Sequence, residues 1–352
     1  MLIAILNDTH SGVRNSSEIF IEYQRKFYEE VFFPYCEDHD IKQVIHLGDY
    51  YDHRKNVNFK ALNSNRRMFL EPLRDKGMMM DIIPGNHDVY HKNTNDLCSL
   101  KELLGYYTSN VNIIMNPTSV VYDGCNINLL PWISANNYET SMDFIRKNDG
   151  VIMSHLELSG FELMRGVVQT HGMSADIFSH YDQVLSGHYH VASQVGNVRY
   201  LGSQMEFTWA DSADDKFFHV FDTNTKDIIK VRNPNTLFEK IYYDDTDVDY
   251  YKEDVSMYVN KFIKVVVENK NDPFMFDKFI DKLSDIETHE LKVVENFQEF
   301  LGENVITSIE DVDNTTDLMY NYIDGVNTDL DKDKLKTLMN TLYNEALDMD
   351  IS

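Results

Sequence analysis

Five apolar runs that each end abruptly in polar residues constrain what this chain can fold into. They are LIAILNDTH (2–10), QVIHLGD (43–49), MMMDIIPGNHD (78–88), VIMSHLE (151–157) and QVLSGHYH (183–190). Continuous apolar runs suit strands that are buried on both faces, and helical patterns at 19–36 and 61–76 separate the first three. The chain is therefore predicted to form a layered α/β core. Further strands at 127–133, 197–204, 217–223 and 227–233 predict a second sheet packed on the first.

The length of 352 residues, 43% of them hydrophobic, predicts two domains and a smaller third element. An acidic stretch opens near residue 240, and beyond it the pattern predicts a strand, a helix and a strand at 261–269, 273–286 and 289–297. The tail 330–349 is amphipathic, with Thr328 and Asp331 as a capping box. We divide the chain at 1–240, 241–300 and 301–352. The apolar stripe of the tail fits packing on its own domain or docking on a partner.

The compartment can be inferred from three absences in the sequence. No run of 18 apolar residues is present, which predicts no membrane span. The N-terminus lacks a basic leader and a cleavage site, so it is interpreted as a first strand. The three cysteines show no metal-ligand spacing and fit free thiols in a reducing cytoplasm.

The formal net charge of -26 argues against nucleic acid as a general partner. The charge is uneven, however. Residues 241–352 hold 27 Asp and Glu against 10 Lys and Arg, whereas residues 53–76 hold seven Lys and Arg against two acidic residues. This basic strip is either a solvated helix face or a local DNA-contacting surface. The candidate DNA contacts are Arg54, Lys55, Arg66 and Arg67.

Polar side chains at strand ends are where α/β folds place ligand chemistry. The runs end in Asp8, His10, Asp49, Asn86, His87, His155, His188 and His190. Asp8 and His10 are two apart, and so are His188 and His190, which would place each pair on one side of an extended strand. A polar turn such as PGNHD at 84–88 needs no chemistry when it stands alone. Five such ends in one chain predict a common site.

The donor types predict a dinuclear metal centre. Carboxylate, imidazole and amide without thiolate suit divalent ions such as Mn²⁺, Fe²⁺ or Zn²⁺. Seven ligands are too many for one tetrahedral ion, but they suit two ions that share a bridging carboxylate. Such pairs clamp the oxygens of a phosphoryl displacement and activate a water. The other histidines are interpreted as core or surface side chains: His39, His46, His53, His91, His171, His180, His219 and His289.

The series DTH, GDYYD, GNHD, SHLE and GHYH resembles the calcineurin-like metallophosphoesterase superfamily over about residues 1–235. The resemblance implies an α/β fold with a two-sheet β-sandwich flanked by helices, here with a small C-terminal α/β capping module and C-terminal helices. It also implies two ligand sets that share Asp49 as the bridge. One set is Asp8, His10, Asp49 and His190, and the other is Asp49, Asn86, His155 and His188. His87 would not ligate metal but would sit near the scissile phosphate and donate to the leaving oxygen or to the developing negative charge, with Asp88 steadying its imidazole.

The spacing HLGDYYDHR, the segment YLGSQMEFTWAD (200–211) and the C-terminal module further resemble the SbcD-type nucleases of DNA double-strand-break repair, and most closely their phage branch. This resemblance implies a nuclease that depends on Mn²⁺, with Mg²⁺, Fe²⁺ or Zn²⁺ as other ions. Its activities would be 3′-to-5′ exonuclease on duplex ends and endonuclease. The implied partners are double-stranded DNA ends, an SbcC-type coiled-coil ATPase docked on the C-terminal helices, and a second copy of the chain. The implied location is the cytoplasm, which is the host cytoplasm for a phage-encoded chain.

Asp52 departs from the family pattern. Some members carry a histidine three residues after the bridging aspartate, and that histidine is linked to exonuclease action, whereas this chain has Asp52 there with His53 beside it. The balance of exonuclease and endonuclease activity stays open on this ground. Two other functions also stay open: a protein phosphatase or nucleotide phosphodiesterase with the same metal site, and a non-catalytic scaffold that tethers the ATPase.

Overall fold

The computed structural model describes residues 1–164, 166–295, 332 and 334–336, and residues 1–297 form one compact unit. Most of the predicted C-terminal region, including the amphipathic tail and its Thr328–Asp331 capping box, lies outside the described residues. Among the residues that are described, no helix has both the length and the apolar character that crossing a membrane requires.

The first sheet has six strands in the order β16-β15-β1-β2-β3-β6. Four are parallel: β1 (Leu2–Leu6), β2 (Gln43–His46), β3 (Met79–Ile82) and β6 (Val111–Ile113). The other two, β15 (Lys216–Asp222) and β16 (Ile228–Asn233), add antiparallel strands at one edge. The parallel register aligns the ends of β1, β2 and β3, so the loops that follow them meet at one edge of the sheet.

The second sheet also has six strands, in the order β13-β14-β12-β9-β8-β7. The parallel strands are β14 (Val198–Tyr200), β12 (Tyr181–Gly187), β9 (Gly150–His155) and β8 (Cys125–Leu130). The edge strands β13 (Ser193–Val195) and β7 (Thr118–Tyr122) run antiparallel to their neighbours. A buried apolar cluster that includes Ile5 of β1 and Leu185 of β12 packs the two sheets face to face.

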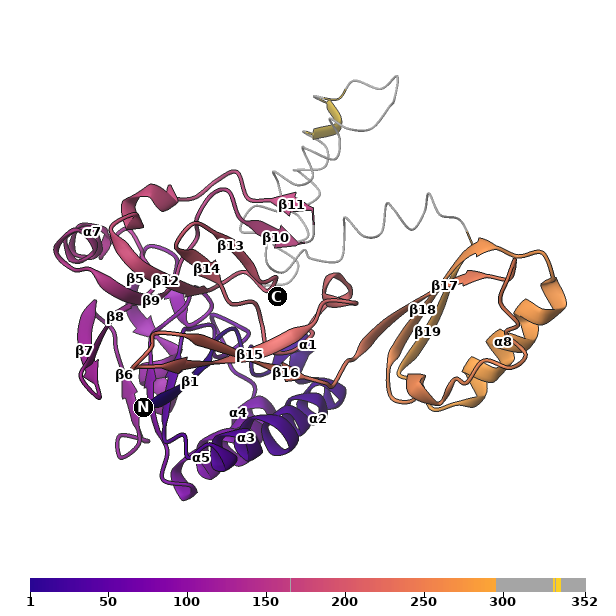
Figure 1. The fold of residues 1–352 in the computed structure, drawn as a ribbon, viewed down its shortest axis with the longest axis horizontal. Coiled ribbons are helices and arrows are strands. Elements are labelled where there is room, and N and C mark those ends of the chain that lie inside the picture. The colour runs from indigo at the N-terminus through magenta and orange to yellow at the C-terminus, as the bar shows by residue number, and fades with distance from the viewer. Residues whose placement is uncertain (165, 296–331, 333, 337–352) are drawn as a thin grey trace. The chain divides into compact units, whose positions relative to one another are not determined.

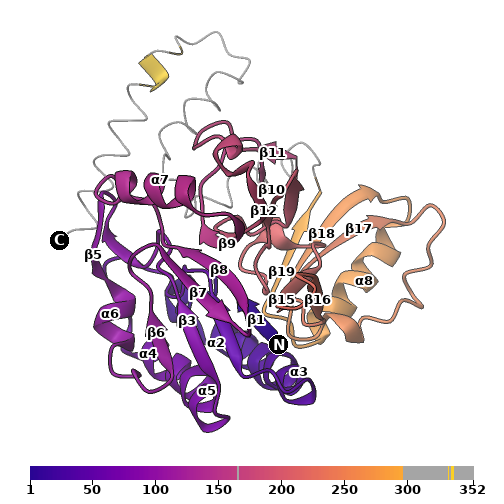
Figure 2. The same ribbon diagram turned by 60° about the vertical axis from the view of Figure 1, so that its left-hand side comes forward.

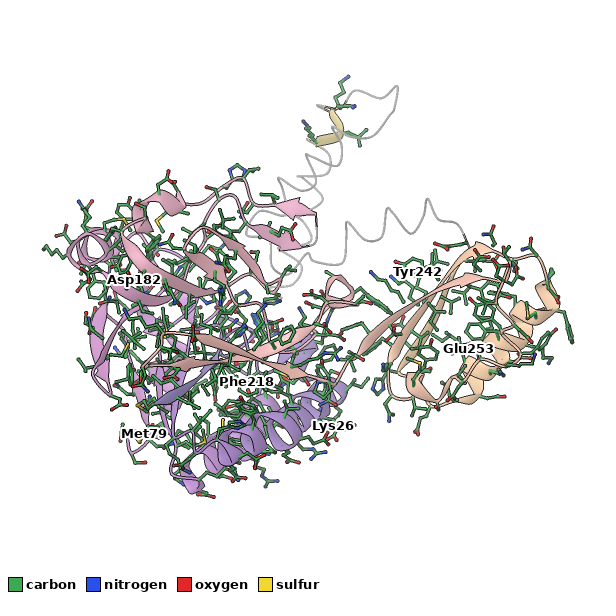
Figure 3. The ribbon with its side chains drawn as sticks, viewed as in Figure 1. Lys26, Met79, Asp182, Phe218, Tyr242 and Glu253 are labelled. Atoms are coloured by element: carbon green, nitrogen blue, oxygen red, sulfur yellow. The ribbon has the colours of Figure 1, made fainter. Side chains whose placement is uncertain are left out.

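Helices cover the outer face of the first sheet (Figure 1). The predicted helical segment 19–36 is present as α2 (Glu18–Lys26), η1 (Phe27–Phe32) and α3 (Phe33–Asp38). The segment 61–76 is present as α4 (Phe59–Asn65), η2 (Arg66–Leu70) and α5 (Glu71–Asp75). Their apolar side chains, such as Phe27 and Phe69, form one cluster with Phe218 of β15, which is labelled in Figure 3. On the outer face of the second sheet, α7 (Tyr138–Lys147) and η3 (Ala175–Phe178) pack in the same way (Figure 2).

The predicted two-sheet α/β sandwich flanked by helices is therefore confirmed. Shorter elements complete residues 1–240 and the start of the small module. They are α1 (Val13–Ser16), β4 (Val89–His91), β5 (Thr94–Cys98), α6 (Ser99–Leu104), β10 (Glu162–Met164), β11 (Val167–Val168), η4 (Trp209–Asp211) and η5 (Ser256–Tyr258).

A small parallel sheet with its own core follows. Its strands are β17 (Phe238–Asp244), β18 (Phe262–Asn269) and β19 (Glu290–Val294), and α8 (Pro273–Asp285) lies between the last two in sequence. The helix begins where the side chain of Asp272 accepts from the amides of Phe274 and Met275, with Pro273 in the first turn. The predicted strand, helix and strand are thus present, and the first three residues of β17 precede the boundary that we placed after residue 240.

Candidate metal centre

The predicted donors of the first run lie in the loop that follows its strand. β1 ends at Leu6, and Asp8 and His10 have left-handed backbones, with φ of 47° and 41°. The expectation that these side chains project from one side of an extended strand is therefore wrong. The loop bends because the Asp8 amide donates to the Gly48 carbonyl (2.9 Å) and the His10 amide to the Asp49 carbonyl (3.1 Å), which joins it to the loop after β2.

Two further donors share this unusual backbone. Asp49 has φ of 53° and His188, just after β12, has φ of 90°. A left-handed residue other than glycine costs on the order of 1–3 kcal/mol and persists only where its surroundings hold it. Such residues cluster at functional sites, and here four of the predicted metal ligands have this conformation.

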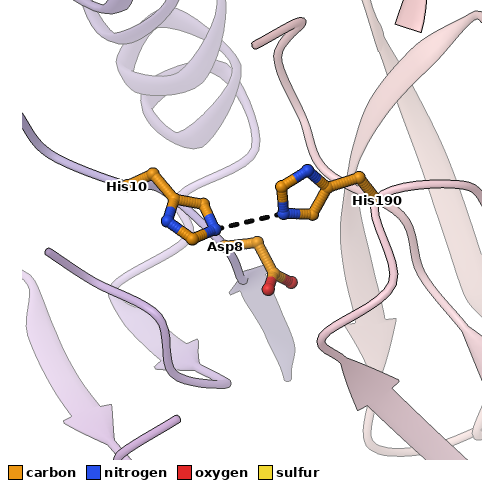
Figure 4. A group of neighbouring side chains, drawn as sticks. All are labelled: Asp8, His10 and His190. Atoms are coloured by element: carbon orange, nitrogen blue, oxygen red, sulfur yellow. Dashed lines mark hydrogen bonds between the residues drawn. The ribbon is translucent and has the colours of Figure 1, made fainter. Parts of the chain in front are cut away.

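Asp8, His10 and His190 form the first group (Figure 4). One ligand atom from each lies within 4.8 Å of the others, and the Nε2 atoms of the two imidazoles are 3.1 Å apart. Asp8 and His10 are buried, and His190 is half-buried. Two imidazole nitrogens and a carboxylate that converge in this way form a suitable half-shell for one divalent cation.

Asp49, His155 and His188 form the second group, again within 4.8 Å of one another. The side-chain oxygen of Asn86 lies 2.9 Å from both Nε2 of His155 and Nδ1 of His188, so the amide belongs to the same cluster. Nδ1 of His155 is 2.8 Å from the Leu47 carbonyl. Because a carbonyl only accepts, this contact keeps a proton on Nδ1 and turns Nε2 toward the group.

Asp49 links the two groups, because it belongs to the second and its carboxylate also approaches the first. Its Oδ2 atom is 3.3 Å from Nε2 of His155 in the second group and 3.9 Å from Nε2 of His10 in the first. Its Oδ1 atom accepts from the amide of His87 at 2.8 Å. The sequence-predicted ligands are thus all brought together, in two sets with one carboxylate between them, and the donor types suit two divalent cations.

Glycine permits this packing at two positions. A Cβ on Gly85 would lie 2.2 Å from Oδ1 of Asp49, and a Cβ on Gly48 would lie 2.4 Å from the amide nitrogen of Gly85. Gly48 also has φ of 92°, a backbone conformation that residues with a side chain rarely adopt. The turn PGNHD therefore needs its glycine because the Asp49 carboxylate passes directly over it.

The environment of His87 differs from the expectation that Asp88 steadies its imidazole. Asp88 is fully buried, and its carboxylate accepts from the backbone amides of Gly85 (2.9 Å) and Tyr50 (3.1 Å). Nδ1 of His87 instead lies 2.6 Å from the backbone carbonyl of Asp52. Asp88 thus shapes the loop that carries Asn86 and His87, because backbone amides occupy its oxygens.

Asp52 is a site residue whose role the sequence did not reveal. Its side-chain Oδ1 lies 3.3 Å from Nδ1 of His10, and its main-chain carbonyl accepts from Nδ1 of His87. Burial opposes ionisation of Asp52, but His10 holds the pKa of this carboxyl below its ordinary 3.8. A carboxylate behind a ligating imidazole fixes the orientation of the ring and raises its basicity. The only signal in the sequence was the departure from the family histidine at this position.

The GSQMEF segment also supports the centre in a way that sequence reasoning missed. Asn7 donates from Nδ2 to Oδ2 of Asp8 (2.6 Å) and to the Gly202 carbonyl (2.8 Å). Gln204 is fully buried, and its side-chain oxygen and nitrogen each lie 3.3 Å from backbone atoms of the loop after β1. The ring of Phe207 meets those of His10 and His190 edge-on, at 5.5 Å between centroids. In the sequence, the signal for this supporting role was a polar segment that directly follows a predicted strand.

Opposite charges meet at the second group. Burial lowers the pKa of His155, but the Asp49 carboxylate beside it outweighs burial and raises that pKa to about 9. Burial raises the pKa of the Asp49 carboxyl, but His155 and His87 hold it well below 3.8. A cation that binds the imidazole of His155 must therefore displace a proton from it.

The basic strip of residues 53–76 is partly neutralised. Lys60 pairs with Glu18 and Lys76 with Glu37, both outside the strip, whereas Arg74 pairs with Asp75 and Arg66 with Glu71 inside it. Of the candidate DNA contacts, Lys55, Arg66 and Arg67 are exposed and Arg54 is half-buried. The positive surface is thus weaker than the sequence count suggested, and DNA contact by these four residues stays a prediction.

Comparison with known proteins agrees with the motifs. The sequence profile of the family described as "Calcineurin-like phosphoesterase" matches residues 1–192. Exonuclease subunit 1 of Enterobacteria phage T4 is 31% identical over 349 residues, which cover 98% of this chain and 99% of that protein. The resemblance inferred from the motifs is therefore confirmed.

Two solved structures are more distant. An archaeal phosphodiesterase is 18% identical, and the match covers 66% of this chain and all of that one, with a TM-score of 0.35. A protein of unknown function from Aquifex aeolicus is also 18% identical, over 44% of this chain and 77% of that one, with a TM-score of 0.26. Neither likeness is close enough to support an argument. The family profile and the full-length relative, together with the site geometry, place this chain in the calcineurin-like phosphoesterase family.

Proposed function

We propose that this chain is a metal-dependent DNA nuclease that hydrolyses phosphodiester bonds, with 3′-to-5′ exonuclease action on duplex ends and endonuclease action. The observation that carries the proposal is the position of Asp49 between two groups of histidine and carboxylate ligands. The full-length similarity to a phage exonuclease subunit supports DNA as the substrate.

In this proposal Asp8, His10 and His190 hold one divalent cation with Asp49, and Asn86, His155 and His188 hold the other with Asp49. The family resemblance favours Mn²⁺, and the donor set of carboxylate, imidazole and amide also suits Fe²⁺ or Zn²⁺, with Mg²⁺ as a further competitor. When bound, the cations supply Lewis-acid polarisation of the phosphodiester and activate a water for attack. Asp52 orients His10, and the loop held by Asp88 positions Asn86.

His87 acts as the acid that protonates the leaving oxygen. Its Nδ1 faces the Asp52 carbonyl, which can only accept, so Nδ1 keeps its proton and the proton given to the leaving oxygen comes from Nε2. The main-chain amide of His87 donates to Asp49, which ties the acid to the proposed bridge. A side chain that is fixed in this way can donate a proton without ligating either cation.

The similarity to the phage exonuclease subunit also supports the proposed partners. They are double-stranded DNA ends, an SbcC-type ATPase bound through residues 301–352, and a second copy of the chain, in the host cytoplasm. The module 241–300 would face DNA. Deletion of residues 328–352 should abolish co-purification with the ATPase and leave basal nuclease activity intact. A truncated chain that still co-purifies with the ATPase would contradict the docking role.

The direct test is digestion of an end-labelled DNA duplex by the purified chain, with and without Mn²⁺ and with and without the ATPase. We expect labelled products only when metal is present. A phosphopeptide and a cyclic nucleotide serve as parallel substrates for the two other phosphoesterase functions. Turnover of either one without turnover of DNA would replace the nuclease assignment.

A further inference from the structure

A cavity whose lining includes three basic side chains lies at the edge of the interface between the two sheets. Its volume is about 210 Å³. The lining residues are Ala192, Ser193, Gln194, Arg199, Tyr200, Leu201, His219 and Lys230, and this described lining contains no carboxylate. That is unusual for a chain with a net charge of -26. The cavity includes none of the proposed metal ligands.

The three basic side chains reach the cavity from both sheets. His219 of β15 is directly opposite Lys230 of β16, so both point to the same face of the first sheet. That face packs toward the second sheet, because Phe221, two residues after His219, belongs to the cluster between the sheets. Arg199 of β14 alternates with the outward-packed Val198 and Tyr200, so it points toward the same interface from the other side.

His219 occupies a position that the strand pattern assigns to an apolar core residue. It is 1% exposed, and neither ring nitrogen has a hydrogen-bond partner among the described residues. The hydroxyl of Ser193, which lines the same cavity, is also buried without a partner in that part of the chain. Buried polar groups are normally satisfied, so two unpartnered groups in one cavity indicate that a ligand or an ordered water completes them.

The local field favours an anion. Burial, together with the charges of Lys230 and Arg199, lowers the pKa of His219 to about 3, so the ring is neutral and has positive charge beside it. A neutral imidazole still donates one N–H, and a serine hydroxyl donates one O–H. Together with a guanidinium and an ammonium, they match the oxygens and the double charge of a phosphate group.

The volume limits the part of a ligand that can enter the cavity. At the ~30 Å³ that each water occupies in the liquid, the cavity holds about seven waters. Pockets for drug-sized ligands are larger, at roughly 300–1,000 Å³. A phosphate group with part of its hydration shell fits within it, whereas a whole nucleotide does not.

We propose that His219, Ser193, Arg199 and Lys230 form a phosphate-binding site, separate from the metal centre, at the edge of the interface between the sheets. Its ligand is inorganic phosphate or the terminal phosphate of a monoester whose remainder lies outside the cavity. The second source rests on the proposed function, because exonuclease action on DNA releases nucleoside monophosphates.

The test is calorimetric titration of the full chain, kept free of metal by chelation so that the metal centre does not bind anions. The ligands are inorganic phosphate, a nucleoside 5′-monophosphate and the unphosphorylated nucleoside. We expect saturable binding of one phosphate per chain. Binding of the nucleoside monophosphate as well would show that the site also takes the terminal phosphate of a monoester. Binding of the nucleoside alone would overturn the proposal.

Variants locate the binding. Arg199→Gln and Lys230→Gln each remove one charge-assisted contact and should weaken phosphate binding about tenfold or more. The matched control is Arg232→Gln, which removes an equal charge two residues along β16, where Arg232 pairs with Asp215 outside the cavity. Ring resonances of His219 should shift on addition of phosphate. An equal loss in Arg232→Gln, or no saturable binding by wild type, would refute the site, and neither outcome depends on nuclease activity.

Discussion

The carboxylate of Asp52 lies 3.3 Å from Nδ1 of His10, on the side of the ring opposite the Nε2 atom that faces His190. This pairing gives a role to the residue that departs from the family pattern. The main-chain carbonyl of the same residue accepts a hydrogen bond from Nδ1 of His87. Asp52 therefore connects a proposed metal ligand to the proposed acid.

Asp52→Asn should weaken Mn²⁺ binding by about 10–100-fold, because the amide cannot supply the negative charge that orients His10 and raises its basicity. The contact of His87 should survive, since it uses the backbone. Calorimetric Mn²⁺ titration measures the effect, with Asp75→Asn, an exposed carboxylate, as the control. Unchanged Mn²⁺ affinity in Asp52→Asn would remove this role.

His87→Ala should lose about 10²–10⁴-fold in the rate of DNA hydrolysis and keep wild-type Mn²⁺ affinity, because in the proposed mechanism His87 donates a proton without ligating metal. Single-turnover digestion and metal titration separate the two quantities. His91→Ala, an exposed histidine four residues on, should change neither. Full activity in His87→Ala would show that another group protonates the leaving oxygen.

Much of this site could be predicted from the sequence because strand periodicity and donor type are local properties. The side chains at the ends of the apolar runs, Asp49, Asn86 and His155, lie together in the fold, because parallel strands bring such ends to one edge. The left-handed backbones of Asp8 and His10 could not be predicted, because they depend on hydrogen bonds to a loop some 40 residues away. The partners of Asp88 and Asp52 are also non-local. The surroundings of His219 could not be predicted either. A histidine in a strand carries no local sign that it lines a cavity and lacks a hydrogen-bond partner in the described part of the chain.

Gly85→Ala should lower Mn²⁺ affinity, because its Cβ would lie 2.2 Å from Oδ1 of Asp49 and 2.5 Å from the Asp49 amide nitrogen. The carboxylate must move, and overpacking of this kind also costs ~1–3 kcal/mol of stability. Gly160→Ala is the matched control: its Cβ meets nothing within 4 Å although its φ is +89°. It should lose some stability through backbone strain and keep Mn²⁺ affinity. Equal Mn²⁺ affinity in the two variants would contradict the crowding argument.

Glu206 should make stability depend on pH. It is buried, it accepts from the amides of Leu237 and Phe238 at the start of β17, and burial raises its pKa from 4.5 to about 7. The folded chain therefore holds this proton more tightly than the unfolded chain. The resulting stabilisation is complete below pH 4.5 and is lost as the pH rises to about 7, by up to ~3 kcal/mol.

Glu206→Gln does not titrate, so the thermal midpoint of wild type should fall relative to that of the variant between pH 4.5 and 7. Glu102→Gln, which removes an exposed carboxylate, should follow wild type throughout this range. A constant difference between wild type and Glu206→Gln would show that Glu206 keeps its ordinary pKa in the fold.

The number of Mn²⁺ ions bound per chain is the most direct measurement of the central claim, that Asp49 joins two cation sites. Elemental analysis combined with calorimetry should find two Mn²⁺ ions per wild-type chain. Asp49→Asn should weaken both sites, whereas His190→Ala should weaken one and His155→Ala the other. A single Mn²⁺ ion in wild type, or an Asp49→Asn variant that still binds two with full affinity, would contradict the account.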